Sequence, residues 1–305
     1  MSFACGIGFA NCDIFFLGLP RIPDEGEELY ARSFDIQAGG GVPATMTVLA
    51  RLGVPVKLAT FLGRDEFSER VERALVASGM AYTNLYAGDG YPTVISSTAV
   101  TAYNRTFISY REDVPITQGM RERAVALFRG AKLMELQLGM LDICRDVKAA
   151  SPDAAVVLDT GWNDDMSVER YRDYLEMADY YTPNRIEAMK LTGTHTPLDA
   201  LHALAAHLAH PIVKLDTEGC LVMADGRPIL VPPLPGVRFV DATGAGDAFL
   251  AGLMYGLYHG RDIVDCVRYG NVTGGVCVQA VGCLTGRVDE RELMRLAGAI
   301  EPRAL

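Results

Sequence analysis

The stretch Phe239-Val240-Asp241-Ala242-Thr243-Gly244-Ala245-Gly246-Asp247-Ala248-Phe249 carries the strongest local signal in the 305-residue chain. Apolar residues continue from it at helical spacing, which predicts a helix that begins near Ala245 after a strand that ends near Val240. Small residues at a helix N-terminus leave backbone N–H groups free at the positive end of the helix dipole, which is an anion site. Asp247 in the first turn either compensates that dipole or acts as a general base beside a bound phosphate.

A second glycine cluster, Gly39–Gly41, precedes another predicted helix and would let a ligand touch the backbone. Gly39-x-Gly41-x-x-Ala44 formally matches a dinucleotide fingerprint, so a nicotinamide-dependent oxidoreductase is an alternative interpretation. The segment before it is polar, however, and no acidic residue follows at a strand end about 20 residues on, as that motif requires. A G-x-x-x-x-G-K-[ST] motif is absent from the sequence, which excludes a P-loop NTPase.

Short apolar runs alternate with helical patterns along most of the chain, which indicates an α/β protein with a mainly parallel sheet. Strands are predicted at 4–8, 56–61, 133–138, 156–159, 212–215 and 221–223. Helices are predicted at 44–52, 66–78, 121–129, 168–177, 185–191, 198–208, 245–259 and 262–278.

Two segments break this alternation: 14–37 is mixed polar and aromatic, and 91–111 reads as an alternating strand rich in Thr, Ser, Val and Tyr. We expect them to pair as a small antiparallel sheet that forms a lid over the strand ends, where open α/β sheets bind ligands. Residues 1–305 are expected to form one domain with this lid inserted in it.

Composition and charge exclude several classes of protein. An apolar fraction of 50% with 22% charged residues excludes a disordered chain. A net charge of −10 disfavours binding to nucleic acid or to an anionic membrane. The seven cysteines are odd in number and match no zinc spacing, and the N-terminus has no signal-peptide pattern, so we expect free thiols in a cytoplasmic protein.

The segment Asp241–Asp247 resembles the D-T-x-G-A-G-D signature of the ribokinase-like, or PfkB, carbohydrate kinases. Further segments resemble that family in its order along nearly the whole chain. They are Asn11-x-Asp13 closing the first strand, Gly39–Gly41, Gly63-Arg64-Asp65, Asn104-Arg105-Thr106 in the lid, Asn184-x-x-Glu187, and Val213–Asp216 with Gly219. The resemblance implies a ribokinase-like three-layer α/β/α sandwich with a mainly parallel sheet and a small antiparallel β lid.

The resemblance also implies a reaction, the ATP-dependent phosphorylation of a hydroxyl on a sugar or sugar-like molecule. Asp247 would be the general base, and the backbone N–H groups of Gly244, Ala245 and Gly246 would hold the developing phosphoryl charge. A catalytically inactive sugar-binding relative is a further alternative, against which the intact Asp247 argues.

Ligand contacts follow from the same resemblance. Substrate would meet Asn11, Asp13, Gly40, Gly41 and Gln137. ATP would meet Asn184, Glu187, Lys214, Asp216, Gly219, Asn271 and Gly274, with Glu187 acting on Mg²⁺ through water and with Asp241 and Thr243 near a monovalent cation such as K⁺. From the residues alone, turn chemistry for Asn11 and Asp13 and helix capping for Asn184 and Glu187 remain open.

Departures from the family pattern leave the substrate open among ribose, a ketohexose, a keto-deoxy sugar acid and a nucleoside. Ala44 or Thr45 stands where many members have a sugar-binding Asn, Asp216 replaces a Gly near the phosphates, and Ala242 replaces a Thr. Lid arginines, of which Arg105 is one, could meet an acid or phosphate. Relatives pair through their lids, so the resemblance also implies a homodimer.

Overall fold

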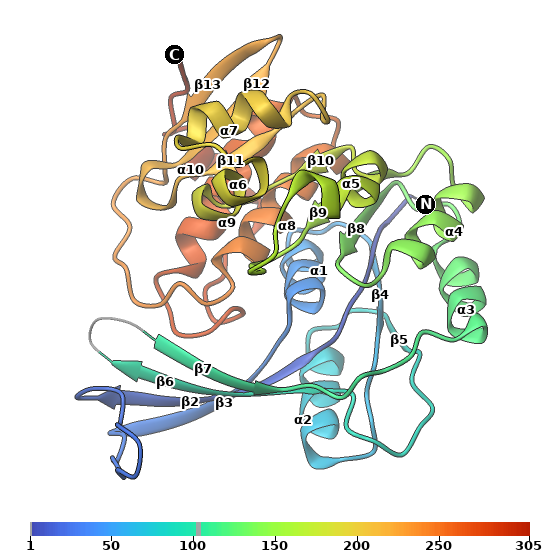
Figure 1. The fold of residues 1–305 in the computed structure, drawn as a ribbon, viewed down its shortest axis with the longest axis vertical. Coiled ribbons are helices and arrows are strands. Elements are labelled where there is room, and N and C mark those ends of the chain that lie inside the picture. Colours follow the sequence, from blue (N-terminus) through green and yellow to red (C-terminus); the bar gives the residue numbers. More distant parts are fainter. Residues whose placement is uncertain (1, 102–104) are drawn as a thin grey trace.

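The computed structural model describes residues 2–101 and 105–305, and its centre is a six-stranded parallel sheet in the order β10-β9-β8-β1-β4-β5 (Figure 1). The strands are β1 (Ala4–Ile7), β4 (Val56–Thr60), β5 (Tyr82–Asn84), β8 (Leu133–Gln137), β9 (Ala155–Asp159) and β10 (Tyr180–Tyr181). Because every pair in this sheet is parallel, all six carboxyl ends lie on one edge. Asn104, one of the predicted lid residues, lies outside the described residues.

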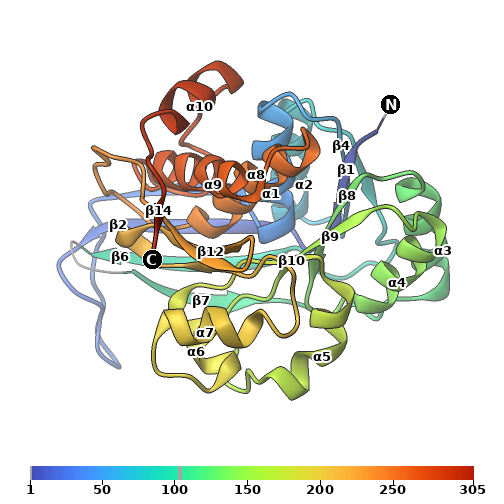
Figure 2. The same cartoon turned by 90° about the horizontal axis from the view of Figure 1, so that it is seen from above.

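Helices cover both faces of this sheet and make the predicted three layers (Figure 2). One buried apolar layer includes side chains of α1 (Gly41–Arg51), α2 (Glu66–Ala77), α8 (Ala245–Tyr258), α9 (Ile263–Cys277) and α10 (Glu290–Ala297). The other includes side chains of α3 (Gln118–Phe128), α4 (Leu141–Ala150), α5 (Val168–Met177), α6 (Arg185–Thr192) and α7 (Pro197–Leu204). None of the helices within the described residues combines the length and the apolarity needed to span a membrane.

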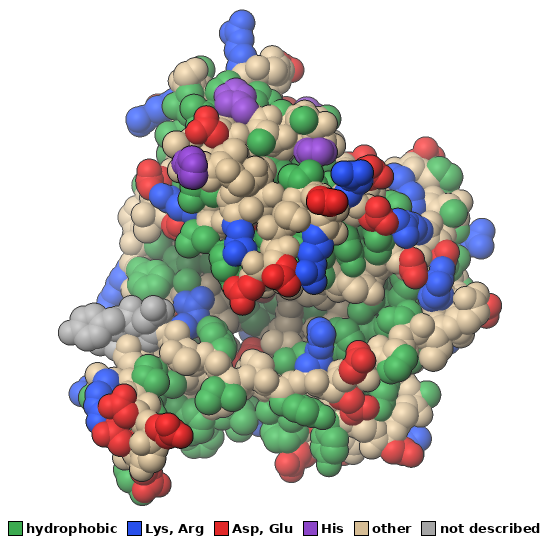
Figure 3. All heavy atoms as spheres, viewed as in Figure 1, with side chains coloured by type: hydrophobic (Ala, Val, Ile, Leu, Met, Phe, Trp, Pro, Cys, Tyr) green, Lys and Arg blue, Asp and Glu red, His purple; other side chains and the backbone are tan. Residues whose placement is uncertain are grey.

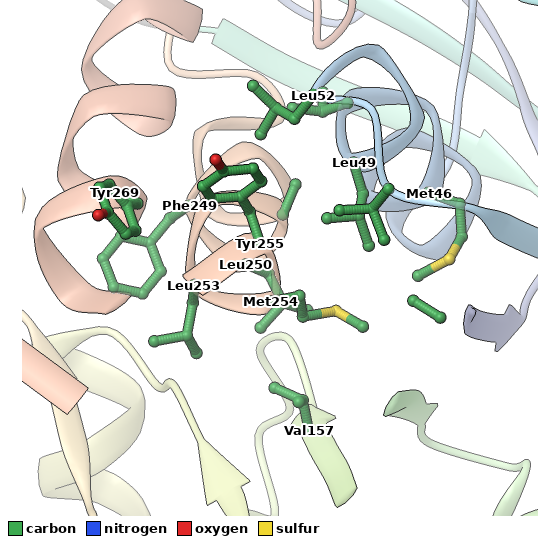
Figure 4. Packing of buried hydrophobic residues seen from close by; sticks show 14 of the residues in the cluster. Met46, Leu49, Leu52, Val157, Phe249, Leu250, Leu253, Met254, Tyr255 and Tyr269 are labelled. Carbon is green, nitrogen blue, oxygen red and sulfur yellow. The ribbon is translucent and has the colours of Figure 1, made fainter. Parts of the chain in front are cut away.

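The packing of α1 against α8 positions the glycine-rich ends of both helices. Met46 and Leu49 of α1 meet Leu250 and Met254 of α8 over Val157 of the sheet, and all five side chains are buried (Figure 4). Burying a side chain of this size contributes about 1.5–3 kcal/mol, so the pair is held firmly. Its consequence is that the N-termini of α1 and α8 lie together beside the carboxyl ends of the strands.

A second, antiparallel sheet follows the parallel one in the chain. It consists of β11 (Ile212–Lys214), β12 (Cys220–Ala224), β13 (Arg227–Val231) and β14 (Arg303–Ala304), in that order. The backbone N–H of Lys214 donates to the carbonyl of Pro183 at 2.9 Å, beside an isolated parallel bridge to Asn184. This contact brings Lys214 to the same edge as the strand ends.

The lid is a four-stranded sheet in the order β3-β2-β6-β7. Its strands are β2 (Asn11–Leu19), β3 (Ser33–Gly39), β6 (Val94–Thr101) and β7 (Arg105–Tyr110). The prediction of a purely antiparallel lid is wrong at one pair, because β2 and β6 run parallel while β2–β3 and β6–β7 are antiparallel. A parallel pair needs a long crossover, and residues 40–93 between the two hairpins supply it.

Two local predictions are also wrong. Asn11 does not close the first strand, because β1 ends at Ile7 and Asn11 begins β2. No strand ends at Val240, since residues 238–240 are irregular and Phe239 is 66% exposed. The backbone N–H of Val240 instead donates to the carbonyl of Val278. The apolar pair Phe239-Val240 has the composition of a strand, but it has no neighbouring strand with which to pair.

Candidate active site

Gly244 starts α8 in a left-handed conformation with φ +75°, and the helix carries no side-chain cap. The N–H of Ala245 donates to the carbonyl of Ala242 at 3.2 Å, so it is turned into the loop. For the N–H groups of Gly246 and Asp247, the described residues offer no backbone acceptor. This helix end therefore offers free donors of the kind that an anion site needs, although they include Asp247 and leave Ala245 out, and the anion site itself stays a prediction.

Asp247 lies in the first turn of α8, where it faces the substrate side of the glycine run. A Cβ added to Gly41 would be 3.4 Å from Oδ1 of Asp247 and 3.3 Å from Nε2 of Gln137. Desolvation and the nearby carboxylate of Asp159 raise the pKa of Asp247 to about 7, while Lys214 opposes the shift. A carboxyl group with such a pKa suits proton abstraction near neutral pH.

Asp13 projects from β2 to the same place. Its side chain is 6% exposed, and burial raises its pKa to about 6 although Ser96 and Asn11 donate hydrogen bonds to it. A Cβ on Gly39 would overlap Oδ2 of Asp13, so a side chain there would displace this carboxylate. Asn11, Asp13, Gly40, Gly41 and Gln137 therefore come together as predicted, around a hollow between the lid and the body that is visible in Figure 3.

Lys214 brings positive charge to the α8 end of the hollow. A Cβ on Gly246 would lie 3.4 Å from its Nζ, and Lys214 lowers the pKa of both Asp247 and Glu187 against the effect of burial. Asn184 and Glu187 form a capping box at the start of α6, in which each side chain accepts a hydrogen bond from the backbone N–H of the other residue. The capping interpretation is thus confirmed for this pair, and it leaves a buried carboxylate beside Lys214.

The remaining predicted nucleotide residues lie around the adjoining loops. Asp216 pairs with Arg185, whose Nε is 3.0 Å from Oδ2, and this cation reduces its repulsion of a phosphate. Gly219 has φ +93° and packs against the backbone at Val231 and Pro232, which requires glycine. The amide of Asn271 donates to the carbonyls of Val231 and Pro232, so its side chain holds that loop, and its contact with a nucleotide stays a prediction.

Gly274 and Ala44 have packing roles. A Cβ on Gly274 would approach the carbonyl of Ala245 to 3.2 Å, so this glycine allows α9 to lie close to α8. Ala44 is buried in α1, as is Thr45, whose hydroxyl is directed to protein acceptors. Neither residue supplies the sugar contact that an Asn makes in the family pattern.

Asp241 is engaged with protein donors and a lid arginine. Its Oδ1 accepts hydrogen bonds from the N–H and hydroxyl of Thr243, and its Oδ2 accepts from the N–H of Gly282. Nη1 of Arg105 lies 3.4 Å from Oδ1. Across residues 2–101 and 105–305, the structure has no cluster of three His, Cys, Asp or Glu side chains suited to a metal. The carboxylate of Asp241 thus already has a cationic partner, and K⁺ at Asp241 and Thr243 stays a prediction.

A Mg²⁺ ion bound with ATP requires few protein ligands. This ion keeps several waters and takes one or two carboxylates together with substrate phosphates, so a dedicated cage is not required. Glu187, a buried carboxylate beside Lys214, fits such a water-mediated role.

Two acidic residues of the site were not predicted. Asp159 ends β9, and Glu135 lies in the middle of β8 with 1% of its surface exposed. The carboxylate of Asp159 raises the pKa of Asp247, and the carboxylate of Asp247 raises the pKa of Glu135. Asp159 could have been found from its place at the carboxyl end of a strand, and Glu135 from its position as an acid within an apolar run.

A separate hollow on the described part of the chain lies elsewhere. It measures about 760 Å³ and is open and mostly apolar, between residues 85–88 and α3, with Arg123 and Glu122 at its wall. It contains none of the predicted site residues. We therefore place the functional site from the converging polar groups rather than from the size of the hollow.

A parallel α/β sheet, free N–H donors at a helix N-terminus and a carboxyl group with a raised pKa are features that enzymes of phosphoryl transfer combine. The chain belongs to the pfkB family of carbohydrate kinases, whose family model matches residues 7–290. The Gly39–Ala44 fingerprint does not open a βαβ unit, because it follows lid strand β3, and the oxidoreductase alternative is therefore wrong.

Known relatives agree with this family. A ribokinase from Arabidopsis thaliana is 25% identical over 95% of this chain and 79% of its own. The solved structure of an Arabidopsis thaliana ribokinase with ribose and ATP has a TM-score of 0.80 and 23% identity, and the match covers 97% of this chain and 99% of that one. A nucleoside kinase from Burkholderia thailandensis with inosine has a TM-score of 0.81 at 19% identity, covering 97% of each chain.

Gly244 offers a sharp test of the helix end. Gly244→Ala should lower the melting temperature, because an L-residue is strained at φ +75° and its Cβ would overlap that of Cys283. Gly236→Ala is the matched control, since Gly236 also has φ +75° but no atom within 4 Å of an added Cβ. Thermal denaturation should show a loss for Gly244→Ala larger by about 1–3 kcal/mol. Equal losses in the two variants would contradict the close contact.

Proposed function

We propose that this protein transfers the γ-phosphoryl group of ATP to a hydroxyl of a sugar or sugar-like molecule. The observation that carries the proposal is the place of the Asp247 carboxylate, 3.4 Å from the Cβ position of Gly41 and in the first turn of a helix with free N–H groups. A substrate resting on the glycine run would meet the base there. The ribose and ATP complex of the Arabidopsis ribokinase supports this assignment by similarity.

In the proposed step, Asp247 takes the proton of the substrate hydroxyl as that oxygen bonds to the γ-phosphorus, while the bond to the leaving ADP oxygen breaks. The N–H groups of Gly246 and Asp247 and the ammonium of Lys214 stabilise the charge on the transferring group. Mg²⁺, when bound with ATP, neutralises phosphate charge. Glu187 would hold one of its waters.

Asp13 and Gln137 orient the substrate in this proposal. The Asp13 carboxylate can accept two hydroxyl hydrogen bonds, and the Gln137 amide can donate and accept. Since neither Ala44 nor Thr45 contributes a further polar contact, we infer a site with fewer fixed hydroxyl contacts than the family pattern has. Nucleosides and sugar acids therefore belong in the substrate panel beside ribose and ketohexoses.

ATP consumption against that panel, for the wild type and for Asp247→Asn, tests the reaction. With the best substrate, Asp247→Asn should lose about 10²–10⁴ in kcat, the typical contribution of a general base. Asp153→Asn is a control, because that exposed residue precedes β9 and so lies at the opposite edge of the sheet from the site. Full turnover by Asp247→Asn would show that Asp247 is not the base, and a wild type that phosphorylates nothing in the panel would contradict the proposed reaction.

The pH profile should report the raised pKa values. Asp247 works only when ionised, so kcat/KM of the wild type should level off above about pH 7, the pKa of Asp247, and fall below it. Asp13, with a pKa of about 6, should steepen the fall below that pH, because its protonation removes an acceptor for the substrate. An Asp13→Asn variant should keep only the shallower slope. A wild-type profile that stays flat down to pH 5 would contradict both assignments.

We also propose a homodimer through the lid. Strand register places Phe16, Phe34, Ile108 and Tyr110 on the outer face of the lid sheet, and all four are exposed, with Ile108 at 76% and Phe34 at 68%. Figure 3 shows hydrophobic side chains along this part of the surface. An apolar sheet face of this kind is usually covered by a partner.

Light scattering at micromolar concentration should give a dimer for the wild type and a monomer for Ile108→Glu, since an unpaired charge in such an interface costs about 2–5 kcal/mol. Met294→Glu is the matched control, because Met294 is exposed on α10, which packs against α9 and not against the lid strands. A monomeric wild type would refute the dimer.

A further inference from the structure

Glu135 is an acid inside an otherwise apolar layer. It lies in the middle of β8 on the face that packs against α1 and α8, with Leu133 on its own strand and Val157 on β9 as apolar neighbours. Only 1% of its surface is exposed. An ionised carboxylate in such a place is costly unless it has several donors or a cation.

Few donors are available to Glu135. Its Oε1 lies 3.3 Å from Oγ1 of Thr45, and its Oε2 has no hydrogen-bond partner among the described residues. Thr45 Oγ1 also lies 3.1 Å from the carbonyl oxygen of Gly41 and 3.3 Å from that of Asp247. A hydroxyl carries one proton, so Thr45 cannot donate fully to three acceptors.

The groups around Glu135 also disfavour its ionised form. From β9 and α8 it is approached by the carboxylates of Asp159 and Asp247, and from β1 by the Cys5 thiol, whose own pKa it helps to raise. Burial first, and then the two carboxylates, raise the pKa of Glu135 well above its usual value. Ionised Glu135 would place a third negative charge beside the proposed base.

We propose that Glu135 is a neutral carboxylic acid that positions Asp247 for catalysis. Its O–H donates to Oγ1 of Thr45, and the Thr45 hydroxyl then donates to the backbone carbonyls of Gly41 and Asp247. The inference rests on the proposed role of Asp247 as base. Thr45 is thereby the link between the start of α1, where substrate rests, and the first turn of α8, which carries the base.

This network does two things for the reaction. It fixes the spacing between the glycine run and Asp247, and a small misplacement of reacting groups can cost about 10²-fold in rate. It also keeps Glu135 uncharged, so that this acid adds no negative charge to those of Asp159 and Asp247, and Asp247 can ionise near neutral pH. The amide of a glutamine can both fix this spacing and leave the site uncharged, because it is a neutral donor with the same shape as a carboxylic acid.

The experiment compares Glu135→Gln with Glu135→Leu, and Thr45→Ser with Thr45→Val, using the best substrate of the panel. Glu135→Gln and Thr45→Ser should stay within about threefold of the wild-type kcat, while Glu135→Leu and Thr45→Val should lose at least about tenfold. KM values for both substrates should change less than kcat. Infrared difference spectra of wild type minus Glu135→Gln at pH 7 should show the carbonyl band of a protonated carboxylic acid.

Three results would overturn the proposal: no such band in the wild type, a loss in Glu135→Gln as large as that in Glu135→Leu, or full kcat in Thr45→Val. The infrared result concerns the wild type, so it stands even where Glu135→Leu fails to fold. It is also independent of the base. Full activity of Asp247→Asn together with the infrared band would remove the proposed function and leave Glu135 neutral, whereas an inactive Asp247→Asn without the band would remove only this inference.

Discussion

The structure depends on the burial of carboxyl groups where the N-terminus of α8 meets the carboxyl ends of the parallel strands. Burial is the first cause of the raised pKa at Asp13, Glu135 and Asp247 alike. A carboxyl group whose pKa is raised on folding binds its proton more tightly in the folded state, so its contribution to stability falls as the pH rises from its unfolded pKa to its folded pKa. For Asp247 that range runs from about 4 to about 7. The site is thus destabilising at neutral pH, and the packed core of α1 and α8 offsets it.

The same concentration of acids raises the question of how a chain with net charge −10 would hold a polyphosphate. The answer is local. The free N–H groups at the start of α8 and the ammonium of Lys214 are directed to one end of the hollow, and Arg185 pairs with Asp216 beside it. Positive potential over a few ångströms is enough for an anion site, whereas the overall charge acts on large partners at long range.

Much of this fold follows from local periodicity in the sequence. The helices of α5 and α8 and the strands β4 and β8 were predicted to within about two residues, because amphipathic spacing and strand-like apolar runs are local signals. The parallel pairing of β2 with β6 was not predicted, since it joins segments about 80 residues apart that local pattern does not connect. Helices α4 and α10 were missed as well. Residues 238–240 show the reverse error, an apolar pair without a partner strand.

The site divides in the same way. The two glycine runs and Asp247 can be recognised in the sequence, because turns, close backbone approach and a helix start require specific residues. The role proposed for Glu135 cannot be recognised in this way, because it arises only when β8, α1 and α8 come together around Thr45.

The lid shows how one strand can serve both recognition and association. Side chains alternate along β2, so Asp13 and Phe15 face inward and are buried while Phe16 faces outward and is exposed. A one-residue slip in its register would move the carboxylate out of the site and the apolar residue into it. Pairing with β3 on one side and β6 on the other prevents that slip, and the contact of Arg105 with Asp241 ties β7 to the loop that starts α8. The substrate recognition proposed for Asp13 would therefore depend on the integrity of the whole lid sheet, and a partner that covers its outer face would stabilise the register on which the inner face depends.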